Sequence, residues 1–258
     1  MKYNVLDEFE VQMRGAGYRA ETVRKYRTRL DCLLGDQLLI ENANDIDFVK
    51  IMKQLSTIKY KNYFSQAKNA LLHFCEFQGI QLNKEYLQKI SILESKTKKK
   101  YRKSNIIDYQ QISKTIKNLK NDKLKLSYNT MMCTGLRVTE ISQITPIDCK
   151  IEDDKIVFYF IGKGGENEEV SISKNVDIKF FNTLVKHIKS TDDNKKVFYS
   201  AIYLQQNAKK LNFHCHDLRR IFAQLEYQKT KDKKQVQEKL RHTNIKTTNI
   251  YLRYKIKF

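Results

Sequence analysis

The chain has 258 residues, of which 49 are Lys or Arg and 29 are Asp or Glu, so its formal net charge is +20 at pH 7. Its hydrophobic content of 41% suffices for a folded core, which argues against a wholly disordered chain. A mean hydropathy of −0.62 and the lack of any long apolar run exclude a membrane-spanning protein. The first residues turn acidic and amphipathic at once, so we expect no secretion signal and a cytoplasmic location.

The positive charge is distributed unevenly along the chain. Residues 1–95 contain 14 basic and 12 acidic residues, a net charge of +2, whereas residues 96–258 contain 35 and 17, a net charge of +18. Such an excess favours a polyanionic partner, most often nucleic acid, although a Lys-rich surface that only maintains solubility gives the same total. Either interpretation of the charge therefore applies mainly to the part of the chain after residue 95.

The five cysteines form no CxxC pair and no regular framework, which is typical of reduced thiols in a cytoplasm. His214-Cys215-His216 invites a zinc site. No second cluster of metal ligands accompanies it in the sequence, so we expect no metal.

Residues 1–80 show helical periodicity. Apolar side chains recur every three or four residues from 23 to 34 and again from 58 to 77, and glycines at 15, 17 and 79 interrupt the pattern. We predict a bundle of about four helices, in which basic side chains such as Arg24, Lys25 and Arg27 lie off the apolar face.

A strongly basic segment follows this bundle. Residues 96–103, Lys-Thr-Lys-Lys-Lys-Tyr-Arg-Lys, carry six basic residues in eight, and only the tyrosine is suited to burial. We predict an exposed linker over residues 95–105, between a helical domain at 1–94 and a second domain at 106–258. Three roles are open for it: a solvated hinge, a strap along a phosphate backbone, or a localisation signal.

The second part of the chain mixes helices and strands. Residues 155–161 are β-branched and aromatic and predict a strand, residues 162–165 predict a turn, and residues 169–172 predict the returning strand. Helical patterns surround this hairpin, so we expect a chain that is mainly α with a small β-sheet. The predicted helices cover residues 107–119, 124–133, 137–144, 175–189, 200–211, 217–228, 232–240 and 246–253.

Two segments of this second part combine residue types suited to phosphate chemistry. Arg137, two residues after Gly135, would begin a helix and offer a planar cation to an oxyanion, with Glu140 one turn later to hold it. Such a pair at i,i+3 is also commonplace on protein surfaces. His216 and Arg219 share a helix face, which would bring a proton carrier beside a phosphate-neutralising cation.

Two further segments are less specific by themselves. Lys163 lies in a Gly-Lys-Gly-Gly turn whose glycines let the backbone approach a ligand, but most such turns are only turns, and this one is no Walker P-loop. His242 and Tyr251 stand nine residues apart in a chain with 15 tyrosines, most of which we expect to serve packing. The order of all these residues along the chain is therefore the informative feature.

That order, Arg, Lys, His-x-x-Arg, His and Tyr, resembles the tyrosine recombinase (phage integrase) family, with a layout closest to the two-domain Xer-type site-specific recombinases. The matching words are TGLRVTE at 134–140, GKG at 162–164, HDLRR at 216–220 and LRHTNIKTTNIY at 240–251. The helical start and the basic linker are also similar to those of the family. The resemblance implies an N-terminal helical core-binding (SAM-like) domain and an α+β tyrosine-recombinase catalytic domain.

The resemblance further implies a site-specific DNA recombinase that cleaves and rejoins strands through a covalent 3′-phosphotyrosyl intermediate, without metal, ATP or another cofactor. Tyr251 would attack the scissile phosphate, and Lys163 would protonate the leaving 5′-oxygen. Arg137 and Arg219 would brace the non-bridging oxygens, while His216 would assist proton transfer at the tyrosine.

Supporting and DNA-contacting residues follow from the same resemblance. His242 would donate a hydrogen bond to the phosphate, and Glu140 would support the site. The implied partners are double-stranded DNA and further copies of the chain, which would form a homotetramer on paired sites. A partner recombinase or accessory protein is a further possible partner. The implied location is the nucleoid. The basic side chains expected to bind DNA are Arg24, Lys25, Arg27, Lys98, Lys99, Lys100, Arg102, Lys103, Arg220 and Arg241.

The sequence departs from the family pattern at three points. Arg241 stands where the family usually has Gly, and Arg220 stands where a second His often follows. Only seven residues follow Tyr251, which argues against the tail exchange between subunits seen in many relatives, and Tyr254 is a rival nucleophile. Two alternatives therefore stay open: a catalytically silent DNA-binding relative that acts as a regulator, and a type IB topoisomerase-like relaxing enzyme.

Overall fold

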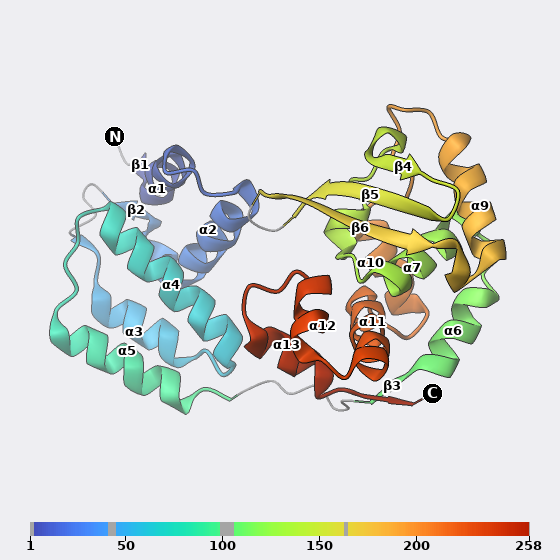
Figure 1. Ribbon diagram of the computed structural model, residues 1–258. Coiled ribbons are helices and arrows are strands. Elements are labelled where there is room, and N and C mark those ends of the chain that lie inside the picture. Colours follow the sequence, from blue (N-terminus) through green and yellow to red (C-terminus); the bar gives the residue numbers. More distant parts are fainter. Residues whose placement is uncertain (1–2, 41–44, 99–105, 163–164, 258) are drawn as a thin grey trace. The chain divides into compact units, whose positions relative to one another are not determined.

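The computed structural model describes residues 3–40, 45–98, 106–162 and 165–257. The chain divides into two compact units, Met1–Arg102 and Lys103–Phe258, which we call unit 1 and unit 2 (Figure 1). The predicted fold class is confirmed, because helices dominate both units and the strands form small sheets.

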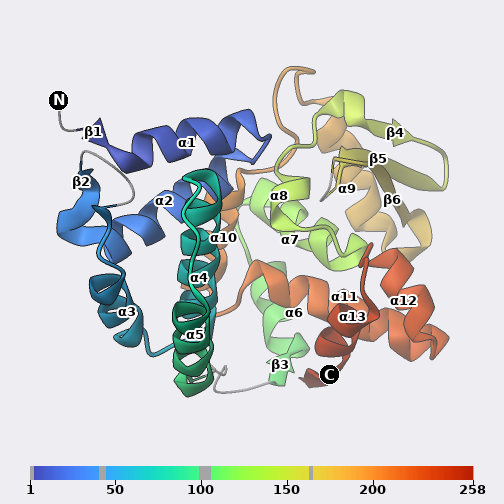
Figure 2. The same ribbon diagram turned by 90° about the vertical axis from the view of Figure 1, so that its left-hand side faces the viewer.

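Unit 1 is a helical bundle. α2 packs against α1 and α4, and α5 packs against α3 and α4 (Figure 2). Fully buried aromatic side chains fill its core, among them Phe9, Phe64 and Phe74, and the ring centres of Phe9 and Phe74 lie 5.6 Å apart. The elements are β1 (Tyr3–Asn4), α1 (Val5–Gly15), α2 (Ala20–Leu34), the 3-10 helix η1 (Gly35–Leu38), β2 (Leu39–Ile40), α3 (Phe48–Ser56), α4 (Lys61–Phe77) and α5 (Lys84–Lys96).

Helix α5 is absent from the helices that the periodicity predicts. The side chain of Asn83 caps it by accepting a hydrogen bond from the backbone N–H of Tyr86. Ile90 is the one buried residue of α5, so this helix lacks the wide apolar stripe from which an amphipathic helix is recognised in a sequence. α5 continues to Lys96, and Lys98 forms a β-bridge with Tyr60, so residues 95–98 of the expected linker belong to unit 1. Residues 99–105 lie outside the described part of the chain.

Unit 2 contains the remaining helices and strands. Its described residues form a three-stranded antiparallel sheet of order β4-β5-β6 and a parallel pair, β3 with β7. The elements are β3 (Ile106–Asp108), α6 (Tyr109–Lys117), α7 (Asp122–Thr134), α8 (Val138–Ile141), η3 (Pro146–Asp148), β4 (Cys149–Ile151), β5 (Lys155–Ile161), β6 (Asn167–Ser173), η4 (Lys174–Val176), α9 (Ile178–Lys189), α10 (Ala201–Lys210), α11 (Cys215–Thr230), α12 (Lys233–Lys239), α13 (Ile245–Leu252) and β7 (Lys255–Lys257).

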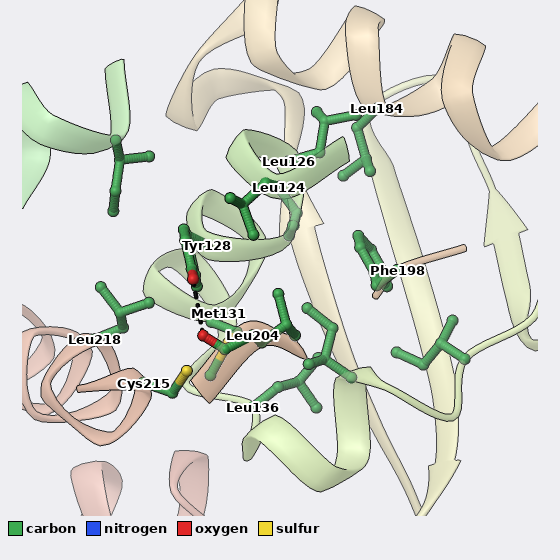
Figure 3. Close-up of a cluster of buried hydrophobic side chains, with 14 of the residues drawn as sticks. Leu124, Leu126, Tyr128, Met131, Leu136, Leu184, Phe198, Leu204, Cys215 and Leu218 are labelled. Carbon is green, nitrogen blue, oxygen red and sulfur yellow. Dashed lines mark hydrogen bonds between the residues drawn. The ribbon is translucent and has the colours of Figure 1, made fainter. Parts of the chain in front are cut away.

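Helix α7 lies at the centre of the unit 2 core. It packs against α6, α8, α9, α11 and β6, and its apolar side chains face those of the neighbouring elements (Figure 3). Tyr128 is fully buried there, and its hydroxyl donates a hydrogen bond of 2.8 Å to the carbonyl oxygen of Leu204. That bond satisfies the one polar atom that Tyr128 brings into the core and ties α7 to α10.

The two predicted strands of the hairpin are confirmed: the first has the expected bounds, and the second is slightly longer than expected. β5 and β6 pair antiparallel from Lys155↔Ser173 to Ile161↔Asn167, so Gly162 stands where β5 ends. The short strand β4 adds to the other edge of β5 and was not predicted. The helix expected over residues 137–144 is limited to α8, Val138–Ile141.

The end of the chain is built into unit 2 as a strand. β7 pairs parallel with β3, with Ile107 opposite Ile256, so the residues after Tyr251 lie beside the first strand of the same unit. Gln224 of α11 donates hydrogen bonds to the carbonyl oxygens of Tyr251 and Tyr254. These contacts hold α13 and the residues that follow it against α11 and β3.

We expect the substitution Gly135→Ala to destabilise unit 2 strongly. Gly135 has φ +65°, where an L-residue costs about 1–2 kcal/mol, and an added Cβ would lie 2.5 Å from the Phe222 ring, which adds about 1–3 kcal/mol of overpacking. Urea unfolding monitors the loss. Gly165→Ala is the matched control, because φ is +94° and nothing lies within 4 Å of its added Cβ. Equal losses in the two variants would contradict the packing argument.

Candidate active site

Arg219 on α11 is the largest of the fully buried side chains among the described residues. Only 1% of it is exposed, and its guanidinium donates to the carbonyl oxygens of Gly135 and Leu240. Among the described residues no carboxylate forms an ion pair with it, and its Nε has no hydrogen-bond partner. Burial first, and then the positive charge of Arg137, lower its pKa to about 10. A buried cation without an anion is costly, so this arrangement is suited to binding one.

Arg137 lies beside Arg219 and is held by Glu140. The Arg137 Nη1 and Glu140 Oε1 atoms are 2.5 Å apart, and the backbone N–H of Arg137 donates to Glu140 Oε2 over 2.7 Å. Burial favours a protonated Glu140, but the hydrogen bonds from Arg137 and the charge of Arg241 outweigh it and hold the pKa of this carboxyl below its usual value. Glu140 is therefore ionised, and it aims the Arg137 guanidinium as the sequence predicted.

Tyr251 lies on α13 between two histidine rings. Its side chain is buried, and its hydroxyl is hydrogen-bonded to Nε2 of His216. The ring centre of Tyr251 is 5.1 Å from that of His216 and 4.9 Å from that of His242, both in edge-to-face geometry. The phenol is thus oriented by its neighbours before any ligand binds.

Both histidines are neutral at pH 7. His216 is an exposed residue, but desolvation by the protein on the inner side of its ring, followed by the charges of Arg220 and Arg219, lowers its pKa to about 4. Burial, followed by the charges of Arg219 and Arg137, lowers the pKa of His242 to about 4 as well. A neutral His216 can accept the phenolic proton of Tyr251 through Nε2.

The opening beside these residues is a pocket of about 350 Å³. Arg137, His216 and Arg219 form one side of it, and Gln205 and Lys209 of α10 form another. Tyr251 does not line this pocket, but its hydroxyl is hydrogen-bonded to His216, which does. Two arginines and a neutral histidine at the pocket, with a phenol bonded to that histidine, suit an attack by tyrosine on a phosphate.

Two arginines expected to bind DNA lie at this site with their charges already engaged. Arg220 pairs with Asp217 over 2.7 Å, and its guanidinium lies 4.2 Å from the ring centre of Tyr254. Arg241 pairs with Glu140 and with Glu168 of β6. Glu168 was not among the predicted site residues, because only the folded hairpin brings it to Arg241.

The other predicted residues divide into two groups. In unit 1, Arg24 and Lys98 are exposed, Lys25 pairs with Glu21, and Arg27 pairs with Asp7 and Glu10. The residues outside the described part of the chain are Lys99, Lys100, Arg102, Lys103 and Lys163.

The described residues contain no group of three or more His, Cys, Asp or Glu side chains that could hold a metal ion. All five cysteines are free. In the described part of the chain, no helix combines the length and apolar character needed to cross a bilayer.

This fold and this site define a class, the tyrosine site-specific recombinases, which are enzymes that break and rejoin DNA. Residues 105–256 match the model of the phage integrase family, so the chain belongs to that family. The resemblance inferred from the sequence is confirmed, and with it the class of enzyme.

Relatives of known name agree with this membership. The chain is 24% identical to the tyrosine recombinase XerA of Pyrococcus horikoshii over 270 residues, which covers 96% of this chain and 88% of that protein. Among solved structures, a lambda integrase tetramer bound to a Holliday junction superposes with a TM-score of 0.69 at 17% identity, covering 97% of this chain and 77% of that one. XerH bound to its difH substrate before cleavage gives 0.64 at 18% identity, covering 95% and 79%. At these identities the structural likeness shows the fold.

The buried neutral His242 predicts a loss of stability in acid. Its pKa is about 4 in the folded protein and about 6.5 in the unfolded chain, so between these values the unfolded state binds more protons. The free energy of unfolding therefore falls as the pH drops from about 6.5 to 4, by about 3 kcal/mol from this group. Urea unfolding at pH 7 and pH 4.5 measures the change.

His242→Gln should remove much of this pH dependence. His214→Gln is the control, because it deletes an exposed histidine of the same unit. If the wild-type protein and His242→Gln lost stability equally in acid, the assignment to His242 would be wrong.

Proposed function

We propose that Tyr251 is the nucleophile with which this recombinase cuts DNA, and that it forms a 3′-phosphotyrosyl link and releases a 5′-hydroxyl. The observation that carries the proposal is the pairing of a buried, unneutralised Arg219 with a buried phenol already hydrogen-bonded to a neutral histidine. A phenol with a pKa near ~10 is a weak nucleophile at pH 7 and needs an acceptor for its proton. His216 is that acceptor.

The two arginines bind the scissile phosphate. Arg137 and Arg219 each offer guanidinium N–H groups to a non-bridging oxygen, and their charge stabilises the additional negative charge of the pentacovalent transition state. Arg219 is held by backbone carbonyls and Arg137 by Glu140, so neither cation has to reorganise during the reaction.

His242 and Lys163 complete the set. Nδ1 of His242 lies 2.9 Å from the hydroxyl oxygen of Thr248, and when that hydroxyl donates to Nδ1, the Nε2–H of His242 is free to donate to the phosphate. Lys163 is assigned as the acid that protonates the leaving 5′-oxygen, on the sequence match at 162–164. The reaction exchanges one phosphoester for another, so it requires neither ATP nor a metal ion.

The partner is double-stranded DNA, on which four copies of the chain assemble at paired sites. Support comes from solved relatives of the same fold, described as a lambda integrase tetramer on a Holliday junction and as XerH bound to difH. Unit 1 acts as the core-binding domain and contacts DNA through its basic face at Arg24, Lys25 and Lys98. We place the protein at the nucleoid in the cytoplasm, where such DNA is found.

A nicked suicide substrate tests the nucleophile. Wild-type protein should accumulate a covalent protein–DNA adduct, and Tyr251→Phe should form none, because it lacks the attacking oxygen. Tyr254→Phe is the matched control and should keep the adduct, since Tyr254 packs against Arg220 three residues further along.

An adduct that survives in Tyr251→Phe and disappears in Tyr254→Phe would reassign the nucleophile. Specific DNA binding without any adduct would instead favour the silent relative. Relaxation of supercoiled DNA that lacks a specific site would favour the topoisomerase-like enzyme.

The pH dependence of adduct formation tests the role of His216. Protonation of His216 removes the acceptor for the Tyr251 proton, so the rate should fall as the pH drops through the pKa of His216. That pKa is about 4 without DNA, and a bound phosphate anion should raise it, so the midpoint should lie above 4. His216→Gln should lower the rate by about 10²–10⁴-fold and abolish this acidic limb. An unchanged limb in the variant would refute the assignment.

A further inference from the structure

Arg241 adopts a backbone conformation that disfavours its own residue type. Its φ is +53°, and it is one of three non-glycine residues with positive φ in the described part of the chain. Side chains other than glycine are strained in this region, which agrees with the glycine that the family usually has here. The backbone strain of an arginine at this position must therefore be offset by interactions of its side chain.

The guanidinium of Arg241 connects two parts of unit 2. Its Nη2 is 3.1 Å from Oε2 of Glu140 at α8, and its Nε is 2.6 Å from Oε2 of Glu168 on β6. The Nε–Glu168 contact is an ion pair without an aligned hydrogen bond, and both atoms are buried. The side chain is 11% exposed, and its guanidinium lies 5.0 Å from the ring centre of Phe160 on β5.

Glu168 in turn marks the end of the β5–β6 hairpin. It pairs across the hairpin with Phe160, and its carboxylate packs directly against Gly162. A Cβ on Gly162 would lie 2.5 Å from the carboxyl carbon of Glu168, so the glycine is required for this contact. The ion pair with Arg241 therefore fixes the strand ends from which the turn begins.

The residues on either side of Arg241 in the sequence contact other residues of the site. The carbonyl oxygen of Leu240, one residue earlier, accepts from Arg219, and His242 follows directly. Its partner Glu140 holds Arg137. The Arg241 side chain thus joins the end of the hairpin to Arg137 through Glu140, while the preceding residue, Leu240, contacts Arg219 through its carbonyl oxygen.

We propose that Arg241 is a positioning residue that holds the β5–β6 hairpin against the phosphate pocket through Glu168, in place of a contact with DNA. The inference deepens the proposed function and rests on it, because Lys163 follows Gly162 in the sequence and acts there as the acid. Arg241 touches neither the phosphate nor the reacting atoms. Its two carboxylate partners leave its charge already neutralised.

The test uses two nicked suicide substrates that differ at the leaving atom, one with the natural 5′-oxygen and one with a bridging 5′-sulfur. In both, the Tyr251 oxygen bonds to phosphorus while the bond from phosphorus to the leaving atom breaks, and the electron pair of that bond departs with the leaving atom. An alkoxide must be protonated, whereas a thiol with a pKa near ~8.5 can leave as the thiolate. The sulfur substrate therefore does not need the acid.

We expect Glu168→Gln and Arg241→Gln to slow adduct formation on the oxygen substrate by about 100-fold, as for a misplaced catalytic group. On the sulfur substrate both should react at close to the wild-type rate, and DNA affinity should be unchanged. The double variant should lose no more than Arg241→Gln alone, because that single variant already removes the ion pair between Arg241 and Glu168. Arg241→Gly, whose backbone suits φ +53°, should behave like Arg241→Gln and so separate positioning from a folding defect.

Glu169→Gln is the matched control, because Glu169 is the exposed neighbour on the same strand and should react normally on both substrates. Lys163→Ala should be rescued by sulfur, and Arg137→Ala should not. Equal losses of rate on both substrates in Glu168→Gln and Arg241→Gln would overturn the positioning role. Weakened DNA binding by Arg241→Gln would also overturn it and would show that Arg241 contacts DNA. Failure of sulfur to rescue Lys163→Ala would instead refute Lys163 as the acid, which is an error in the proposed function.

Discussion

The burial of the Arg219 cation without a carboxylate is the constraint on which the rest of unit 2 depends. Removing a charge from water costs several kcal/mol, and the carbonyl oxygens of Gly135 and Leu240 offset only part of it. Both carbonyls come from helix ends, where such groups lack partners within the helix. The ends of α7 and α12 must therefore converge on the Arg219 side chain of α11. The Nε–H of Arg219 has no partner among the described residues, so it can donate to an oxyanion.

Glu140 distributes charge around that cation. Its carboxylate forms ion pairs with both Arg137 and Arg241, and Glu168 forms a second ion pair with Arg241. Arg137 and Arg241 share these two carboxylates, whereas Arg219 forms an ion pair with no described carboxylate. Three cations therefore face two anions, and the pocket keeps a positive charge. The same positive field depresses the pKa values of His216 and His242. One arrangement therefore attracts an anion and keeps a neutral base beside the phenol.

Much of the fold is predictable where the pattern is local. The hairpin strands are recognisable from β-branched and aromatic residues, and most helices from their apolar period, because these signals lie within one element. Helix α5 was not predicted because it contributes little to the core. Strands β3 and β7 were not predicted because each has three residues and pairs with a strand almost 150 residues away in the sequence. In the site, Arg137, His216, Arg219, His242 and Tyr251 were all predicted and meet in unit 2, whereas the role of Glu168 was not predictable.

The sequence by itself determined which chemistry is available, because the identity and order of the ionisable side chains are a property of the chain. The tertiary structure alone decided how these groups act. Among the described residues, it left Arg219 without a carboxylate partner, placed the Tyr251 hydroxyl against a neutral histidine, and set the Arg241 guanidinium between Glu140 and Glu168. Burial and the distances between charges set these properties, and both arise only when elements far apart in the chain pack together.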